Sequence, residues 1–316
     1  MDNQSETRDF LATRRAKITP EQAGLPVYGG NRRVPGLRRG EVAMLAGVSV
    51  EYYTRLERGN LSGVSEGVLE ALARALQLDE AEQAHLFDLA RTASTSRRPQ
   101  RRRPTAQTVR ASVQLTLDAI SNAPAFVRNG RMDIVAANQL GYALYSEMYV
   151  GPVRPANHAR FIFLDSRAHG FYPDWERAAN DTVAILRTEA GRDPYDRGLT
   201  DLVGELSTRS EEFRTRWAAH NVRLHYTGLK HFRHPVVGDL HLMYESLDLS
   251  ADAGLSLLVY TAEPGSPTGD ALRLLASWAA TQQSETQQPE AQQAGAQPAE
   301  TQPSAATRSG PAPRQQ

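Results

Sequence analysis

Four neighbouring side chains, Val50, Glu51, Thr54 and Arg55, bring a methyl, a carboxylate, a hydroxyl and a guanidinium group together within six residues. These groups match what base edges offer: Val50 can meet a thymine methyl, Glu51 can accept from a cytosine amino group, and Arg55 can donate twice to guanine. On a helix over residues 50–58 all four face outward, away from the apolar positions between them. Such a helix is about 13 Å long and fits the major groove of DNA. The segment therefore predicts a base-reading helix.

Two short helices joined by Gly47-Val48-Ser49 would position these side chains. Gly47 can take the left-handed conformation that ends the first helix, and Ser49 can cap the second. Val48 fills the corner, and Ala43 is small enough for the two helices to cross closely. This spacing is typical of a helix-turn-helix.

Three arginines flank the helix pair: Arg38 and Arg39 at its start and Arg58 at its end. All three can contact phosphates, although Arg58 can equally be a solvated surface charge. Residues 1–106 hold 17 basic against 13 acidic side chains, and the remainder hold 19 against 23, so the neutral total hides an excess of four positive charges in the first part. Because only the docking surface needs to be positive, the neutral total does not exclude DNA.

Composition and periodicity predict an α+β chain in four parts. These are an all-α helix-turn-helix domain at 1–93, an Arg/Pro linker at 94–106, an α+β domain at 107–280 and a disordered Gln/Ala/Pro-rich tail at 281–316. Helices are expected over residues 6–16, 37–46, 50–58, 65–78 and 79–93 of the first part. The tail contains no Val, Ile, Leu, Met or aromatic residue, so burial cannot offset its ordering entropy.

The part from 107 to 280 alternates strand and helix patterns. Strands are expected at 125–128, 132–136, 222–232, 240–249 and 255–261, with helices between the second and third and a last helix at 268–280. Asn129-Gly130 predicts a two-residue type I′ turn between the first two strands. Two strands before the helices and three after them predict a five-stranded antiparallel sheet with helices on one face.

Several longer strings resemble one family of regulators. They are VPGLRRGEVAMLAGVSVEYYTRLERG, FYPDWERAA, LRTEAGR, ELSTRSEEFRTRW, HFRHPVVGDL and VYTAEPGSPTGDALRLLASWA. Over residues 8–280 the chain resembles MmyB-like transcription regulators, which have an XRE-type (lambda-repressor-like) helix-turn-helix and a PAS-like ligand-binding domain. Gly40 and Val64 depart from the family pattern, which commonly has Glu and Pro there. Gly40 weakens its helix by up to about 1 kcal/mol relative to Ala, without threatening the fold.

The resemblance implies residue roles in DNA binding. Ser49, Val50, Glu51 and Arg55 stand at the positions where the XRE family reads bases. Arg39 stands at the position of a phosphate anchor, where the family usually has Gln. Which base each residue reads is left open.

The resemblance also implies a small-molecule sensor, with a fatty-acid-like ligand as in the family's pocket. Aromatic side chains could enclose an apolar pocket, and nearby arginines could bind a carboxylate. The candidates are Phe126, Phe161, Phe163, Trp175, Arg187, Phe213, Arg214, Arg216, Trp217 and Tyr260. The alternative is that these aromatic residues form the core and these arginines are surface charges.

Other classes of chemistry lack support in the sequence. There is no cysteine, Walker A loop, Rossmann glycine pattern or HExxH motif, and Gly63-Val64-Ser65-Glu66-Gly67 lacks the buried strand of a nucleophile elbow. His231 and His234 have opposite parity on a strand, which argues against a shared metal. We therefore expect no catalytic residue, metal or cofactor, and no enzyme activity. No apolar run approaches the ~18 residues that cross a bilayer, and we expect a cytoplasmic protein.

The expected function is a transcriptional regulator that binds an operator in double-stranded DNA and responds to a small apolar ligand. A homodimer is expected, because one short helix reads few base pairs and two half-sites raise specificity. The alternative is an antitoxin-like or scaffolding protein whose helical domain binds protein. A mobility-shift assay separates the two, because only the regulator gives a shift that depends on salt and sequence.

Overall fold

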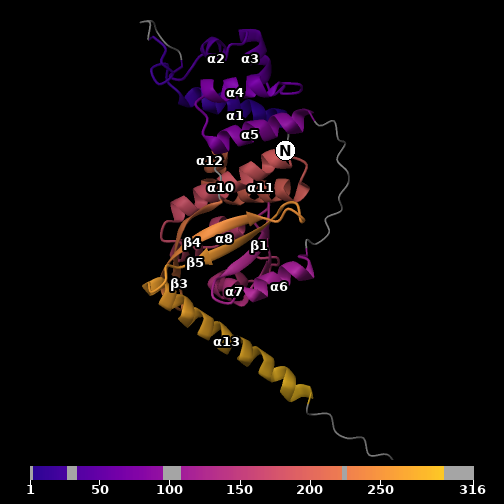
Figure 1. Cartoon of the computed structure of the whole chain (residues 1–316), viewed down its shortest axis with the longest axis vertical. Helices are drawn as coiled ribbons and strands as arrows, with labels where there is room; N and C mark the ends of the chain where they lie inside the picture. Colours follow the sequence, from indigo (N-terminus) through magenta and orange to yellow (C-terminus); the bar gives the residue numbers. More distant parts are fainter. Residues whose placement is uncertain (1–2, 27–33, 95–107, 223–225, 295–316) are drawn as a thin grey trace, which may run out of the picture. The chain divides into compact units, whose positions relative to one another are not determined.

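The N-terminal part folds into five helices, as the apolar spacing predicts (Figure 1). The computed structural model describes residues 3–26, 34–94, 108–222 and 226–294. The five helices are α1 (Asn3–Lys17), α2 (Arg39–Leu45), α3 (Val50–Glu57), α4 (Glu66–Ala75) and α5 (Glu80–Ser94). Their apolar sides meet in one core, which includes the fully buried Phe10, Tyr53, Leu56, Leu72 and Leu86. Burial of such side chains, at about 1.5–3 kcal/mol each, stabilises helices that are too short to be stable alone.

The turn between α2 and α3 has the geometry that its sequence predicts. Gly47 has a φ of +67°, in the left-handed region. Val48 packs against the helical core, and Ala43 of α2 is 1% exposed. The Ser49 hydroxyl caps α3 by accepting a hydrogen bond from the backbone amide of Tyr52 at 3.0 Å. The turn therefore fixes the direction of α3 and of the side chains on its outward side.

One five-stranded antiparallel sheet forms the centre of the C-terminal part, as predicted. Its strands are β1 (Ala125–Asn129), β2 (Ile134–Ala137), β3 (Thr227–His234), β4 (Gly238–Asp248) and β5 (Leu255–Thr261). Their order across the sheet is β2-β1-β5-β4-β3. β1 and β5 are neighbours although they lie far apart in the sequence, and they pair from Ala125↔Val259 to Asn129↔Leu255. Residues 223–225 of the third predicted strand lie outside the described residues.

The predicted two-residue turn at Asn129-Gly130 is wrong. β1 ends at Asn129 and β2 begins at Ile134, and the residue with a left-handed φ of +65° is Met132. The Asn129 side chain organises this longer loop, because its Oδ1 accepts from the amides of Arg131 and Asp133 at 3.0 Å each. Such local side-chain bonding is the alternative that asparagine offers to a tight turn.

Helices cover both faces of the sheet, whereas helices on one face were predicted. α6 (Ala111–Ala119) packs through Leu117 on the face that carries Val127 and Leu257. The opposite face carries Phe126 and Tyr260. The other helices of this part are α7 (Gln139–Leu144), η1 (Ser146–Tyr149), α8 (His158–Leu164), α9 (Ala168–Phe171), α10 (Trp175–Arg192), α11 (Arg197–Arg209) and α12 (Glu211–Ala218). Every residue of β1 is buried, so both faces of this strand need a cover.

The last helix, α13 (Pro267–Ala294), is longer than predicted. The sequence was expected to leave the helix near Ala280 and to continue as a disordered tail. Residues 281–294 are rich in Gln, which has a high helix propensity, so they continue the helix without apolar side chains to bury. The boundary between two compact units of the chain falls between Ala276 and Ser277, within α13.

Two predicted segments cannot be compared with the structure. Residues 95–107, which hold almost all of the predicted linker, and residues 295–316 lie outside the described ranges. Within those ranges, none of the helices combines the length and the apolar composition that a membrane crossing requires.

Candidate DNA-binding surface and ligand pocket

One side of α3 is exposed and the other is buried in the helical core. Val50 is 45% exposed, Glu51 and Arg55 are exposed, and Thr54 is half-buried. Together with Arg58, these side chains line a shallow groove in the surface. The helix that presents them is capped at its start and anchored by apolar residues on its inner side. A base-reading helix needs this combination of a rigid inner side and an accessible outer side.

Tyr52 positions the Arg55 side chain. The guanidinium carbon of Arg55 lies 4.7 Å from the centroid of the Tyr52 ring, within the range of a cation–π contact. Within the described part of the chain, no acidic group pairs with Arg55. Its hydrogen-bond donors are therefore accessible to a base edge, while the stacked ring restricts the side chain.

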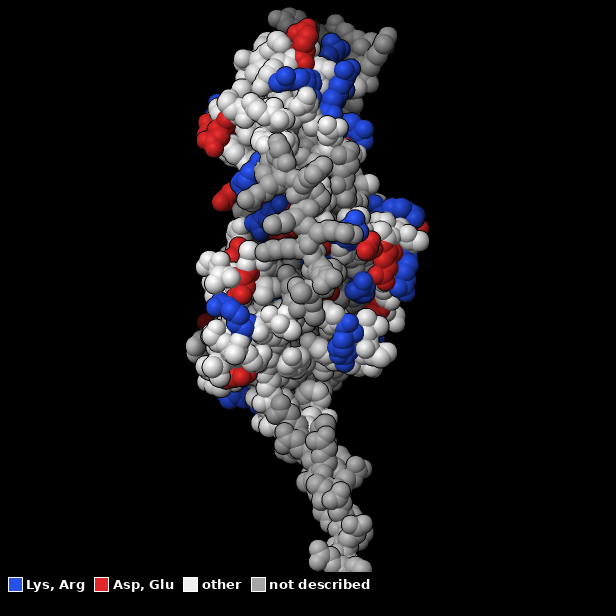
Figure 2. Space-filling model, turned by 90° about the vertical axis from the view of Figure 1, so that its right-hand side faces the viewer, with Lys and Arg blue, Asp and Glu red and all other residues white. Residues whose placement is uncertain are grey.

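A buried carboxylate holds Arg39 at the start of α2. Glu57, the last residue of α3, is 2% exposed and accepts from Arg39 Nε at 2.8 Å and from Arg15 of α1 at 2.7 Å. The Arg39 side chain is still 54% exposed, so part of its guanidinium faces solvent. Arg38 beside it is exposed as well, and its backbone amide donates to Glu41 at 2.6 Å. Figure 2 shows one face of the molecule, with basic side chains close together at the end where Figure 1 places α2 and α3.

Arg39→Ala is expected to weaken binding to every DNA duplex by a similar factor, because a phosphate contact carries no sequence information. The slope of log K against log salt should become smaller by about one. Titrations of a preferred and a scrambled duplex at several salt concentrations measure both effects. Arg74→Ala, at an exposed position of α4, is the control and should change neither. A loss confined to the preferred duplex would contradict the phosphate role.

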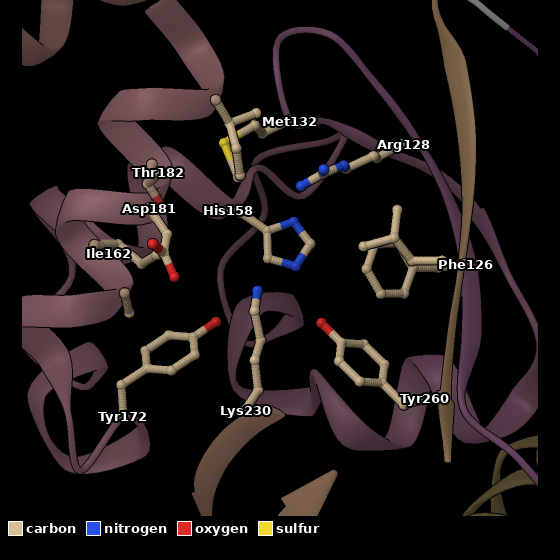
Figure 3. Close-up of a pocket in the computed structure, with 13 residues that line it drawn as sticks. Phe126, Arg128, Met132, His158, Ile162, Tyr172, Asp181, Thr182, Lys230 and Tyr260 are labelled. Atoms are coloured by element: carbon tan, nitrogen blue, oxygen red, sulfur yellow. The ribbon is translucent and has the colours of Figure 1, made fainter. Parts of the chain in front are cut away.

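A small pocket lies between the sheet and the helices α8 and α10 (Figure 3). Apolar side chains form part of its wall: Phe126, Met132, Ile162, Ile185 and Leu258. Polar and charged side chains form the rest, among them Arg128, His158, Tyr172, Asp181, Thr182, Lys230 and Tyr260. The space left free between them is about 10 Å³, enough for about one water molecule. The pocket is therefore nearly filled by its own side chains.

Burial sets the charge state of the polar groups in the pocket. Burial, and then the nearby charges of Lys230 and Arg128, hold the pKa of His158 well below its usual value, so this imidazole is neutral at pH 7. Burial raises the pKa of Tyr260 to about 12, and its hydroxyl bonds to that of Tyr145 at 2.8 Å. Burial, together with the charge of Arg128, lowers the pKa of Lys230 to about 8, so this amine is still mostly protonated at pH 7.

Two family models match the chain. The model described as MmyB-like transcription regulator ligand binding domain matches residues 109–275, and a helix-turn-helix domain model matches residues 9–86. The chain belongs to the MmyB-like transcription regulators. A comparison with curated proteins finds no match. The chain is thus a DNA-binding transcription regulator with a ligand domain, and the expected family resemblance is confirmed.

In this MmyB-like regulator, the residues expected at the DNA lie on one helix pair. They are Arg38, Arg39, Ser49, Val50, Glu51, Thr54, Arg55 and Arg58, and all of them are exposed or half-buried. The hydroxyl oxygen of Ser49 accepts the capping hydrogen bond, which leaves its O–H free to donate. Their contacts with DNA stay a prediction.

The structure brings only two of the expected ligand residues, Phe126 and Tyr260, to the pocket of this MmyB-like regulator. The expected aromatic residues of α8, α10 and α12 form a separate cluster, with ring centroids 5.1–6.1 Å apart: Phe163, Trp175, Phe213 and Trp217. Phe161 packs instead against Phe171 and Tyr172. Most of these aromatic side chains are therefore part of the core.

The three expected arginines lie away from the pocket. Arg216 pairs with Glu176 and stacks on the Trp175 ring at 5.1 Å, and Arg214 is exposed. Arg187 is 1% exposed and pairs with Glu6 of α1. The reason is the same for all three: they lie on helix sides that face solvent or the N-terminal helices.

Sequence reasoning missed the charged residues of the pocket, Arg128, Lys230 and Asp181, and the neutral His158. The alternation of side chains along the strands contained a signal for Arg128 and Lys230. Arg128 shares the parity of Phe126, and Lys230 shares that of Phe232, so both point to the same sheet face as large aromatic side chains.

Proposed function

We propose that this MmyB-like regulator binds a specific operator through α3, and that a small molecule in the pocket changes its operator affinity. The observation that carries the proposal is the outward side of α3, where Val50, Glu51 and Arg55 are exposed on a capped and anchored helix. These side chains match base edges in the major groove. We assign the phosphate contacts to Arg39, with support from Arg38.

A mobility-shift assay with duplexes from the region upstream of the protein's own gene tests operator binding. A shift that weakens with salt and disappears when the sequence is scrambled is expected. A protein that shows no shift, or an equal shift with every sequence, would support the antitoxin-like or scaffolding alternative instead.

The ligand, the oligomer and the location belong to the same proposal. The apolar part of the wall, with Phe126, Met132 and Leu258, supports a ligand with an apolar portion, in line with the fatty-acid-like ligand that the family resemblance implies. A homodimer on a two-fold operator and a cytoplasmic location fit a regulator that reads DNA. No catalytic role is proposed. Sedimentation with and without operator DNA measures the oligomeric state.

Helix α10 connects the pocket to the N-terminal helices. Thr182 and Ile185 line the pocket, and Arg187, about 200° further around the helix than Ile185, lies on the opposite side. There Arg187 donates to the Glu6 carboxylate of α1 and to the backbone carbonyl of Trp217. A ligand that displaces α10 would therefore move a side chain that is bonded to the DNA-binding part. We propose this helix as the element that carries the response.

Glu6 is the centre of the contact between the two parts. Burial by itself would raise the pKa of this carboxyl group. Its contacts with His220 and His85, and the charge of Arg187, outweigh burial and hold the pKa well below its usual value. Glu6 is therefore ionised at neutral pH, and it links α1 and α5 to the helices of the ligand domain. Arg14 of α1 adds a further bond, to the backbone carbonyl of His220.

Gly191→Ala is expected to destabilise the contact between the two parts by about 1–3 kcal/mol. A β-carbon at Gly191 would lie 2.5 Å from the ring of His85, which is 1% exposed and has little room to move. The control is Gly204→Ala on α11, where a β-carbon meets nothing within 4 Å. That control should stabilise the protein by up to about 1 kcal/mol through helix propensity. Thermal unfolding compares the variants, and equal stabilisation by both would contradict a tight α5–α10 contact.

A further inference from the structure

One face of the sheet is covered by a helix over only part of its width. α6 packs on the side that carries Val127 and Leu257, and the same face continues across β4 and β3. There the side chains of Leu229, Met243 and Leu247 are 49–53% exposed, so no described element covers them. Exposed apolar side chains that lie side by side on a rigid sheet are typical of an interaction surface. We call this open half of the face the β3–β4 surface.

The side chains of the β3–β4 surface form a row of cross-strand pairs. From one end of the row to the other, the paired residues of β3 and β4 are Thr227 with Glu245, Leu229 with Met243, His231 with His241, and Arg233 with Asp239. The first pair is a hydrogen bond of 2.7 Å from a hydroxyl to a carboxylate, and the last is an ion pair of 3.3 Å. The two imidazole rings stack with their centroids 4.0 Å apart. Each strand therefore carries side chains that are complementary to those of the other.

The undescribed segments of this sequence do not supply a cover for the surface. Residues 95–107 and 295–316 contain no Val, Ile, Leu, Met or aromatic residue. In the remaining undescribed segments, the large apolar side chains are those of Met1, Val27, Tyr28 and Leu224. None of these segments contains a row of apolar side chains that matches Leu229, Met243 and Leu247. The occupant of the surface is therefore sought in a second molecule.

We propose that a second copy of this chain binds to the β3–β4 surface, with a two-fold axis that runs along the strands between β3 and β4. The inference rests on the homodimer of the proposed function and deepens it by naming the surface through which the two copies meet. Face-to-face packing of two sheets about 10 Å apart, with their strands roughly aligned, is a common arrangement in β-sandwiches.

Complementary side chains identify the occupant as an identical chain. A two-fold axis between β3 and β4 places each β3 residue of one copy over the cross-strand neighbour of that residue on β4 of the other copy. Arg233 of one copy then faces Asp239 of the other, and Leu229 faces Met243. Because the contact is symmetric, each of these pairs occurs twice. Donors therefore meet acceptors and apolar side chains meet apolar side chains across the whole row.

The position of α6 is compatible with this arrangement. α6 packs through Val113 and Leu117 on the half of the face formed by β1, β2 and one end of β5. In the strand order β2-β1-β5-β4-β3, this half lies on one side of β4 and the strand β3 lies on the other. The two-fold operation therefore carries α6 of the second copy beyond the outer edge of β3. The two α6 helices flank the contact and do not separate the sheets.

Sedimentation of the full-length protein without DNA, over a range of protein concentrations, tests the interface. We expect a dimer, and we expect Met243→Glu to weaken dimerisation by about tenfold or more, because it brings two carboxylates into an apolar contact. Val150→Glu, at a residue that follows η1 and is 71% exposed, is the matched control and should leave the dimer intact. Equal dimerisation of the two variants, or an unmodified protein that stays monomeric at hundreds of micromolar, would overturn the proposal. Thermal unfolding confirms that both variants are folded.

A charge exchange separates a contact between copies from a pair within one chain. Arg233→Glu and Asp239→Arg should each weaken dimerisation, because each variant sets like charges against each other across the two-fold axis. An equimolar mixture of the two variants should dimerise again, because both contacts between the copies then join opposite charges. If the ion pair acted only within each chain, mixing would not help, since each chain would keep its own like-charged pair. A mixture that remains as monomeric as its components would overturn the assignment.

Operator binding is measured separately by mobility shift. If Met243→Glu remains dimeric and the operator shift persists, the interface assignment fails and the proposed DNA-binding function stands. If the unmodified protein gives no operator shift but its dimer depends on Met243 and on the charge exchange, the proposed function fails and the interface assignment stands.

Discussion

Arg187→Met is expected to lower the free energy of unfolding by about 3 kcal/mol, because it leaves the buried Glu6 carboxylate without its main partner. Arg187 and Glu6 are 1% and 7% exposed, so solvent does not screen their interaction. His85 and His220 remain within 3.6 Å and 3.4 Å of Glu6, which keeps the loss at the lower end of the range for broken buried pairs. Chemical denaturation at neutral pH measures the change.

The matched control for this prediction is Arg216→Met. The guanidinium carbon of Arg187 lies 4.0 Å from the centroid of the Trp217 ring. Arg216 likewise stacks on a tryptophan and pairs with a glutamate, but its partner Glu176 is 71% exposed. Its loss should cost less than about 1 kcal/mol. The double variant Glu6→Leu/Arg187→Met should recover most of the stability, because replacement of both partners removes the unpaired charge. Equal effects of Arg187→Met and Arg216→Met would contradict a structural role for the Glu6–Arg187 pair.

The same double variant tests whether this pair carries the ligand response. We expect it to bind operator DNA, because Glu6 and Arg187 are not on the outward side of α3. We also expect that a pocket ligand no longer changes its operator affinity. A response of unchanged size would place the connection between pocket and DNA elsewhere.

Arg55→Ala is expected to weaken binding to the preferred operator by about 1–3 kcal/mol, which corresponds to about 5-fold to 150-fold. The loss should be confined to duplexes that carry the base pair read by Arg55, so discrimination at that one position should disappear. Fluorescence anisotropy on a set of singly substituted operators measures both quantities. Arg74→Ala on α4 should retain the affinity and the discrimination of the unmodified protein.

An equal loss of affinity on every duplex would assign a different role to Arg55. If every duplex loses affinity by the same factor, then Arg55 contacts phosphate and another residue of α3 reads the base. Glu51→Ala on the same operator set would then show whether discrimination resides at the neighbouring position.

Local sequence patterns predicted the helix-turn-helix well, because its geometry depends on neighbouring residues. Gly47 ends one helix and Ser49 caps the next within the same short turn. Tyr53 and Leu56 are buried and fix which side of α3 faces the core. The outward-facing residues of this helix could therefore be predicted directly. The same reasoning located all five strands, since their apolar runs are local features, although the turn predicted at Asn129-Gly130 was wrong.

Long-range contacts explain what the sequence could not predict. The role of Arg187 depends on Glu6, which lies 181 residues away in the sequence, and no local pattern joins the two. Arg128 is the last residue of the first predicted strand and no role was predicted for it, although its parity with Phe126 places it on the pocket face. Whether helices cover one face of the sheet or both depends on where α6 packs. The short row of apolar residues on α6 did not reveal which face of the sheet this helix covers.

Selection from a randomised duplex library tests the central claim most directly. The full-length protein and its Arg55→Ala variant are each used to enrich bound DNA at a fixed salt concentration, and the enriched sequences are compared. We predict that the unmodified protein enriches one motif and that the variant enriches the same motif with a single position relaxed. Identical motifs from both proteins, or no motif from the unmodified protein, would contradict the claim that α3 reads the operator.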